Sequence, residues 1–292
     1  MIIAVYGRPT KDNISVNIQQ LFDLLDKLRI QVLVHDSFFV YIKQHLRLSE
    51  NIKTFTRHED LKGHANFLLS IGGDGTLLET ISYVRDSVIP ILGINTGRLG
   101  FLATVSKEEV EPALQALAND KYNIDRRTLL RVETENAVFG NLNFALNEMT
   151  VHVNESSVMM TIHTYINGEY LNSYWSDGLI ISTPTGSTAY SLSCGGPIMI
   201  PDSKSFIITP IAPHNLNARP LIISDNDVVT LKVEGRSKNF LVSLDSRSAT
   251  IESGSELTIS KENFQINLVR LDNQNFIETL RNKLMWGLDK RN

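Results

Sequence analysis

The stretch SIGGDGTLLET, residues 70–80, says most about the fold of this 292-residue chain. The apolar run at residues 67–71 leads into three glycines around one acid, and a leucine-bearing helical pattern follows. Glycines let a backbone adopt conformations that other residues avoid, and amides at a helix start can hold phosphate. We therefore predict a strand-to-helix turn that binds phosphate through Gly72, Gly73, Gly75 and Thr76.

The acid in this turn, Asp74, needs its own explanation because a carboxylate repels phosphate. It suits a hydroxyl group or a metal better, and orienting a nucleophilic hydroxyl for phosphoryl transfer fits both the glycines and the acid. The structural alternative is a tight turn with Asp74 as a helix N-cap, since short glycine motifs often occur by chance. The chain has no G-x-x-x-x-G-K-[ST] and no G-x-G-x-x-G after its first strand. P-loop chemistry is therefore excluded, and an ordinary dinucleotide-binding dehydrogenase is disfavoured.

The first hundred residues alternate between predicted strands and helices. Apolar runs predict strands at residues 2–6, 30–34, 65–71 and 88–94. An amphipathic helix is predicted from the i, i+3, i+4, i+7 spacing of Ile18, Leu21, Phe22, Leu25 and Leu28. This alternation predicts an α/β domain over residues 1–105, with a Rossmann-like, mostly parallel sheet covered on both faces.

The second half of the chain has a different pattern. After a further predicted helix at 106–120, short alternating segments follow, and Asn167-Gly168 between two of them is a strong hairpin signal. We predict a mainly antiparallel β domain over residues 106–269. The tail at 270–292 forms a last helix, and we expect it to pack back on the first domain. Its apolar stripe needs a partner and consists of Phe276, Ile277, Leu280 and Leu284.

Composition narrows the possible functions. The net charge of −4 shows no excess of basic residues of the kind that binds nucleic acid. No apolar run approaches the roughly 18 residues of a membrane span. Cys194 is the only cysteine, so no intrachain disulfide is possible and a reducing compartment is indicated. The seven histidines show no metal-ligand spacing, so we expect no protein metal site. These features predict a soluble cytoplasmic protein.

Three further polar stretches exceed an obvious structural need. Asn147-Glu148 interrupts a strand-like run, and such a pair is costly to bury unless both side chains are satisfied. Residues 183–193 carry six Ser or Thr hydroxyls and Tyr190, which suit a polyhydroxyl or phosphate ligand. Asp245 and Arg247 follow a predicted strand. Each stretch also has a structural alternative. Asn147-Glu148 could mark a bend at the end of a strand, residues 183–193 could be a Ser/Thr-rich loop that caps a helix, and Asp245 and Arg247 could belong to a charged hairpin.

Taken together, these motifs resemble one family, NAD kinase. The resemblance runs from Gly72-Gly73-Asp74-Gly75-Thr76 to Asp245-Ser246 and includes residues 93–102, Asn147-Glu148, Asp177-Gly178, residues 183–190 and Gly195-Gly196-Pro197. The glycine turn alone is shared with lipid kinases and phosphofructokinases. Its combination with Thr-Pro-Thr-Gly-Ser-Thr-Ala-Tyr at 183–190 is much more specific.

The resemblance implies a kinase that phosphorylates the 2′-hydroxyl of the adenosine ribose of NAD, with ATP and Mg²⁺ or another divalent metal, to make NADP. Asp74 would be the base on that hydroxyl. Asn147 and Glu148 would hold ribose and adenine-side groups, and Asp177 would meet the nicotinamide amide. The other residues implied at the dinucleotide are Gly75, Thr188, Ala189, Tyr190, Ser191, Leu192, Ser193, Ala212, Asp245 and Arg247.

Some points of the resemblance stay open. Trp175 stands where some relatives carry Arg or Gly, which puts the use of NADH in doubt, and Arg247 stands where some carry Gln. The family implies a homotetramer or homodimer, and inorganic polyphosphate is an alternative donor to ATP. A lipid or other small-molecule kinase with the same turn is one competing function. A non-catalytic dinucleotide sensor, which would not need Asp74, is another.

Overall fold

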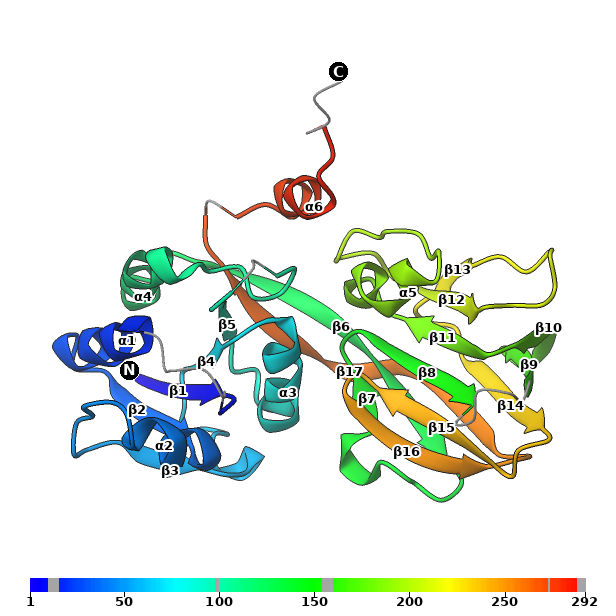
Figure 1. Cartoon of the computed structure of the whole chain (residues 1–292), viewed down its shortest axis with the longest axis horizontal. Coiled ribbons are helices and arrows are strands. Elements are labelled where there is room, and N and C mark those ends of the chain that lie inside the picture. The colour runs from blue at the N-terminus through cyan, green and yellow to red at the C-terminus, as the bar shows by residue number, and fades with distance from the viewer. Residues whose placement is uncertain (10–15, 98–99, 154–159, 273, 288–292) are drawn as a thin grey trace. The chain divides into compact units, whose positions relative to one another are not determined.

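The computed structural model describes residues 1–9, 16–97, 100–153, 160–272 and 274–287 (Figure 1). Arg98 and Leu99 of the family motif therefore lie outside the described residues. The chain forms two compact units. Unit 1 comprises residues 1–126 and 266–292, and unit 2 comprises residues 127–265. No helix in the described part of the chain is long and apolar enough to cross a membrane.

Unit 1 contains a parallel sheet in the order β5-β4-β1-β2-β3. Its strands are β1 (Ile2–Gly7), β2 (Gln31–His35), β3 (Lys53–Phe55), β4 (Phe67–Ile71) and β5 (Ile91–Ile94). The end of the long strand β17 (Glu256–Arg270) adds to the free side of β5, where Leu268 is in register with Ile91. The helices of this unit are α1 (Val16–Lys27), α2 (Asp36–Lys43), α3 (Asp74–Val84), α4 (Val110–Ala118) and α6 (Phe276–Leu284).

Helices cover both faces of this sheet, as the strand–helix alternation predicts. One apolar cluster joins alternate residues of the strands, including Ile3 and Leu69, with the buried sides of α1, α2 and α4. On the other face α3 lies against the strands. A Cβ atom added at Gly93 on β5 would lie 2.6 Å from Cα of Ala103 and 2.9 Å from Cδ1 of Leu77 on α3, so only a glycine fits there. The carboxyl ends of the parallel strands are thus brought together, and the turn at residues 72–73 follows one of them.

Unit 2 is built from two antiparallel sheets. One has the order β13-β12-β11-β8-β15-β16, and the other contains β10, β9, β14 and the first part of β17, with β6 and β7 alongside. The bounds are β6 (Asn123–Thr134), β7 (Phe144–Ala145), β8 (Glu148–Val153), β9 (Met160–Ile166), β10 (Glu169–Ser176), β11 (Gly178–Ser182), β12 (Ser205–Ile211), β13 (Leu221–Ser224), β14 (Val229–Gly235), β15 (Asn239–Leu244) and β16 (Arg247–Glu252). A short helix, α5 (Tyr190–Ser193), follows the 3₁₀ turn Thr185–Thr188.

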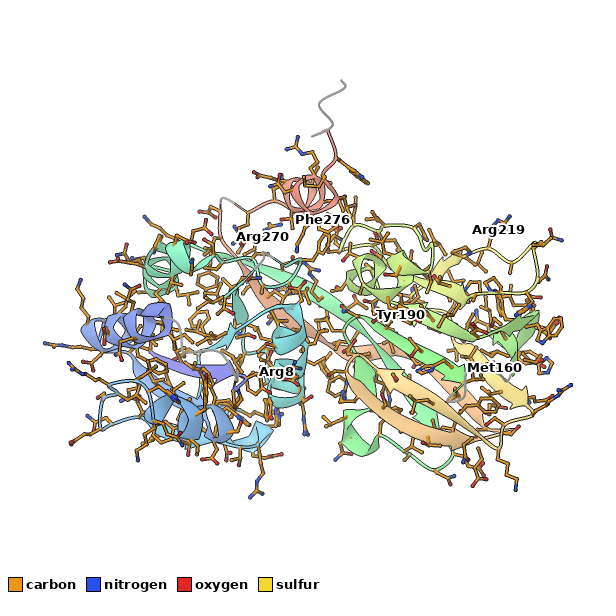
Figure 2. The ribbon with its side chains drawn as sticks, viewed as in Figure 1. Arg8, Met160, Tyr190, Arg219, Arg270 and Phe276 are labelled. Carbon is orange, nitrogen blue, oxygen red and sulfur yellow. The ribbon has the colours of Figure 1, made fainter. Side chains whose placement is uncertain are left out.

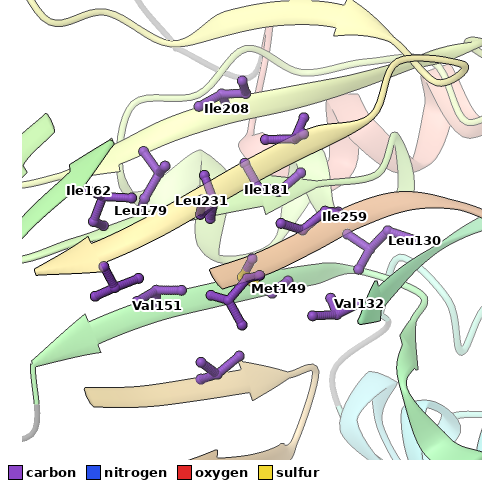
Figure 3. Packing of buried hydrophobic residues seen from close by; sticks show 14 of the residues in the cluster. Leu130, Val132, Met149, Val151, Ile162, Leu179, Ile181, Ile208, Leu231 and Ile259 are labelled. Carbon is purple, nitrogen blue, oxygen red and sulfur yellow. The ribbon is translucent and has the colours of Figure 1, made fainter. Parts of the chain in front are cut away.

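The core of unit 2 lies between its two sheets (Figure 3). Alternate residues such as Met149 and Val151 on β8, or Leu179 and Ile181 on β11, point into it and are fully buried. The residues between them, beginning with Glu148, therefore lie on the opposite face of the sheet. This alternation places the polar side chains of β8 and β11 outside the core.

The predicted fold class is confirmed, and so is the hairpin at Asn167-Gly168. These two residues have φ values of 51° and 84°, and they connect the antiparallel strands β9 and β10. The compact units divide at 126/127 and 265/266, whereas the sequence placed the boundaries near 105 and 269. The reason lies in α4, whose Ala113 and Leu114 join the apolar cluster of the parallel sheet.

The last helix, α6, belongs to unit 1 but buries little of its apolar stripe. Leu280 is 6% exposed, whereas Ile277 is 51% exposed. Asn275 caps the start of this helix, and its side chain accepts a hydrogen bond from the Ile277 amide. The Lys283 ammonium lies 5.8 Å from the centre of the Phe101 ring.

Candidate active site

The glycine turn at the end of β4 has one glycine that the protein itself requires. Gly72 has a φ of 150°, and a Cβ atom added there would lie 2.4 Å from Oγ1 of Thr76. A Cβ atom added at Gly73 or Gly75 would meet no atom of the described residues within 4 Å. The exposed backbone at these two positions can therefore receive a ligand at the start of α3, where amides favour phosphate.

Asp74 opens α3 but does not cap it. Its Oδ2 accepts a hydrogen bond from the amide of Phe101 at 2.8 Å. Its Oδ1 accepts two more, from Leu102 at 3.0 Å and from Ala103 at 2.9 Å. Three consecutive amides thus hold the carboxylate in one orientation. A carboxylate has about four acceptor positions, two on each oxygen. The three amides occupy both positions of Oδ1 and one of Oδ2, so one position on Oδ2 remains for a hydroxyl group.

In unit 2, the Asn147-Glu148 pair stands at the start of β8 and is held by Asp245. Oδ2 of Asp245 accepts from the amide of Leu146 at 2.9 Å. Its Oδ1 accepts from the amides of Asn147 and Glu148 at 2.8 Å and 3.3 Å. Both oxygens accept hydrogen bonds from these amides, so Asp245 contacts the strand that carries the candidate ligand residues. A direct contact with the dinucleotide, which the resemblance implies for Asp245, stays a prediction.

Arg247 supports the same stretch of chain from its other side. Its guanidinium donates to the carbonyl oxygens of Leu142 and Phe144. It also lies 5.3 Å from the centre of the Phe144 ring. Arg247 therefore binds the backbone that leads into Asn147, and the direct ligand contact that the resemblance implies for it stays a prediction.

The hydroxyl-rich segment 183–193 lies against Asn147 and uses most of its hydroxyls internally. Thr183 donates from its hydroxyl to the Leu146 carbonyl at 2.5 Å and from its amide to the Asn147 carbonyl at 2.9 Å. The internal hydrogen bonds of the other hydroxyls involve Thr185, Ser187, Thr188 and Ser191. Hydrogen bonds within the protein thus explain five of the six Ser and Thr side chains in this segment, as expected if it is a structural loop.

Only part of this segment is accessible to a ligand. Ser191 is buried, and its hydroxyl lies 2.9 Å from that of Thr209 on β12. Thr188, Ala189, Leu192 and Ser193 are at least partly exposed, and Tyr190 is 44% exposed (Figure 2). The buried Ser191 fastens α5 to the outer face of the sheet, and its neighbours present the surface.

Strand β11 connects the remaining candidates. Ser182 at its end is in register with Glu148, while Asp177 precedes its start and donates its amide to the Ile211 carbonyl, next to Ala212. Asp177 and Ala212 are exposed. At about 3.3 Å per residue, the two ends of this five-residue strand lie roughly 13 Å apart. That spacing allows one extended ligand to reach from Glu148 to Asp177.

Glu148 has an unusual electrostatic environment. Burial and, to a smaller extent, the nearby Asp245 carboxylate raise its pKa, a hydrogen bond from the Tyr190 amide opposes them, and the resulting pKa is about 8. Its Oε2 atom is buried and has no hydrogen-bond partner among the described residues. A buried carboxyl of this kind is held partly protonated near neutral pH and can donate as well as accept.

Several functional contacts escape sequence reasoning. The backbone amides of residues 101–103 bind Asp74, but a backbone amide cannot be recognised from the side chains in the sequence. The buried Arg127 donates to the Thr185 hydroxyl at 3.3 Å, a contact between residues 58 positions apart. Among the described residues, no three His, Cys, Asp or Glu side chains gather in a way that could hold a metal ion.

Comparison with known proteins gives one consistent family. The profile described as the ATP-NAD kinase N-terminal domain matches residues 3–122, and that of the ATP-NAD kinase C-terminal domain matches residues 146–271. Proteins named NAD kinase from Cytophaga hutchinsonii and Flavobacterium psychrophilum are each 51% identical to this chain, with all of both sequences covered.

Solved structures agree with these sequence matches. An NAD kinase from Archaeoglobus fulgidus, in complex with ATP, has a TM-score of 0.75 at 26% identity and covers 98% of this chain and 99% of its own. Yeast NADH kinase, complexed with NADH, has the same fold, with a TM-score of 0.87 at 23% identity over 98% of this chain and 88% of its own. The chain therefore belongs to the NAD kinase family.

Proposed function

We propose that this protein transfers the γ-phosphoryl group of ATP to the 2′-hydroxyl of the adenosine ribose of NAD, giving NADP and ADP. The observation that carries the proposal is the carboxylate of Asp74. It is fixed by three amides beside an open glycine turn, with one acceptor position left on Oδ2. A base for a sugar hydroxyl and a backbone surface for phosphate thus lie side by side.

In the proposed reaction, Asp74 accepts a hydrogen bond from the attacking hydroxyl. A bond forms between the ribose oxygen and the γ-phosphorus, the bond from that phosphorus to the bridging oxygen of ADP breaks, and the proton passes to Asp74. Because phosphoryl transfer has a loose transition state, the carboxylate mainly orients the hydroxyl and receives its proton late. Gly72, Gly73, Gly75 and Thr76 would face the donor phosphates.

The dinucleotide would be bound in unit 2 along the outer face of β11. Glu148 and Asn147 would meet the adenosine half, and Asp177 with Ala212 would meet the nicotinamide half. The exposed ring of Tyr190 supports this arrangement, because its phenol interacts electrostatically with both Asp177 and Glu148. Burial, the neighbouring Cys194 and, to a smaller extent, these two carboxyl groups raise the pKa of Tyr190. The accessible residues from Thr188 to Ser193 would line the same ligand.

A divalent metal, Mg²⁺ in the simplest case, would accompany the phosphates of ATP. The donor groups of the described residues do not form a cluster for it, so we assign it no protein ligands and derive no step through it. A homodimer or homotetramer and a cytoplasmic location are further parts of the proposal, supported by the family resemblance.

A coupled assay tests the proposed function. Purified protein is incubated with Mg²⁺, NAD and either ATP or inorganic polyphosphate, and NADP is read out with an NADP-specific dehydrogenase. We expect NADP formation with ATP and its loss in Asp74→Asn. No NADP with either donor would overturn the proposal, and NAD binding without turnover would instead indicate a dinucleotide sensor.

A further inference from the structure

We infer that Gly100 is a positioning residue for the reaction, because the missing side chain at this point lets residues 101–103 enclose the Asp74 carboxylate. The inference rests on the proposed role of Asp74, but it also has a consequence for stability that does not depend on that role.

The space at Gly100 is filled by the carboxylate itself. A Cβ atom added there would lie 1.8 Å from Oδ1 of Asp74, 2.5 Å from its Cγ and 2.8 Å from its Oδ2. Contacts under 3.0 Å essentially do not occur for real Cβ atoms, so any other residue at position 100 must displace the carboxylate or the backbone. Gly100 is buried, and the carboxylate is held by three amides, so moving the carboxylate would break these hydrogen bonds.

The constraint at Gly100 is one of space and not of backbone conformation. Its φ lies outside the left-handed region that favours glycine, unlike that of Gly72. The Gly100 amide donates to the Ala103 carbonyl at 3.2 Å, which closes a turn around the carboxylate. An alanine could adopt this backbone, and only its methyl group would be in conflict.

The same turn sets the direction of the carboxylate. Leu102 and Ala103 both donate to Oδ1, and Phe101 alone donates to Oδ2. Oδ2 is therefore the oxygen with an acceptor position left for a substrate hydroxyl. If the turn is pushed away, the carboxylate loses up to three bonds and its fixed orientation.

A double-mutant cycle tests this inference without relying on activity. We expect Gly100→Ala to lower the Tm of the full-length protein in the wild-type background. In an Asp74→Ala background, which removes the atoms that the new methyl group would meet, the same substitution should cost much less. Equal Tm losses in both backgrounds would overturn the inference, because the two positions would then act independently.

Turnover provides the second readout. Gly100→Ala should lower kcat by about 10²-fold, as expected for a displaced catalytic group, with little change in the KM for NAD. In an Asp74→Asn background it should lower kcat little further, because the group that it displaces no longer functions. An unchanged kcat in Gly100→Ala, measured per folded molecule, would contradict the positioning role.

The matched control is Gly97→Ala in the same loop. Among the residues that the structure describes, the nearest atom to a Cβ added at Gly97 is Oδ1 of Asn95, at an ordinary 3.9 Å. Wild-type Tm and kcat are expected for this variant, and losses equal to those of Gly100→Ala would show a general sensitivity of the loop. If the proposed function is wrong, no variant will make NADP, and the wild-type protein will not either. The Tm comparison would still test the contact between Gly100 and Asp74, because it does not depend on activity.

Discussion

Glu148 and Asp245 are joined by a reciprocal pair of hydrogen bonds. The Glu148 amide donates to Oδ1 of Asp245 at 3.3 Å, and the Asp245 amide donates to the Glu148 carbonyl at 3.1 Å. This arrangement holds two carboxylates near each other and out of water. Desolvation raises the pKa of both, and the pKa of Glu148 reaches about 8.

The raised pKa of Glu148 makes stability depend on pH. Its ordinary value is 4.5, so between about pH 4.5 and 8 the native protein keeps a proton that the unfolded chain loses. Stability from this group is complete below that window and declines as the pH rises through it. We expect Glu148→Gln, which cannot ionise, to gain on the order of 3 kcal/mol relative to wild type between pH 5 and pH 8. Thermal unfolding at pH 5, 6.5 and 8 measures this difference, and parallel Tm curves for the two proteins would contradict it.

Arg247 should matter for NAD binding through the backbone that it holds. Arg247→Gln removes the guanidinium that binds the Leu142 and Phe144 carbonyls, at a cost of about 2 kcal/mol in stability. We expect a higher KM for NAD with a smaller change in kcat, because the shifted segment carries Asn147 and Glu148. Steady-state kinetics and thermal unfolding test this. Arg236→Gln, an exposed arginine of the same unit, serves as the control and should leave both values unchanged.

Asp74→Asn should lower kcat by ~10²–10⁴-fold, the usual contribution of a general base. It should also lower the Tm, because the nitrogen of Asn faces an amide donor where Asp74 presents an oxygen, and one hydrogen bond is lost. NAD affinity, measured by calorimetry, should change little. A lower Tm with an unchanged kcat per folded molecule would identify Asp74 as purely structural.

The stability contribution of α6 should come mainly from one side chain. Leu280 is buried, so Leu280→Ala should cost about 2 kcal/mol, the low end of the range for such truncations. Ile277→Ala, at a half-exposed position of the same helix, should stay within about 0.5 kcal/mol of wild type. Denaturant unfolding compares the two variants, and a larger cost for Ile277 would mean that α6 packs by its other side.

NAD should be preferred over NADH. Trp175 is 53% exposed, lies 5.3 Å from the His214 ring between ring centres, and stands two residues before Asp177. An indole face attracts the cationic nicotinamide of NAD but not the neutral ring of NADH, by about 0.5–1 kcal/mol. The kcat/KM ratio of the two substrates measures this. Trp175→Gly should reduce the ratio, whereas Trp286→Gly, also 53% exposed, should not.

Much of this fold could be predicted from the sequence because it depends on local sequence patterns. The turn after Ile71 and the hairpin at Asn167-Gly168 depend on glycine and on neighbouring periodicity, and both appear where expected. The long strands β6 and β17 were not predicted. Each runs from one unit into the other. The alternation of buried and exposed residues therefore changes phase along each strand and does not form one continuous period of two.

The candidate site was harder to predict, for a different physical reason. Asp74, Asp245 and Arg247 could be named as polar residues worth attention, but their partners are backbone groups roughly 27 to 105 positions away in the chain. A backbone amide has no sequence signature, so whether a carboxylate binds substrate or binds its own chain is decided only in the folded protein. The ligand contacts of the accessible residues remain predictions.

Strand β17 has a consequence for how the protein is made. Unit 2 is one continuous stretch, residues 127–265, whereas unit 1 needs residues 266–292 as well as residues 1–126. On the ribosome, the parallel sheet of unit 1 can therefore receive its last strand beside β5 only after Leu268 has emerged. The usual order of synthesis, in which N-terminal domains finish first, is reversed: the unit that begins the chain is the last to be completed.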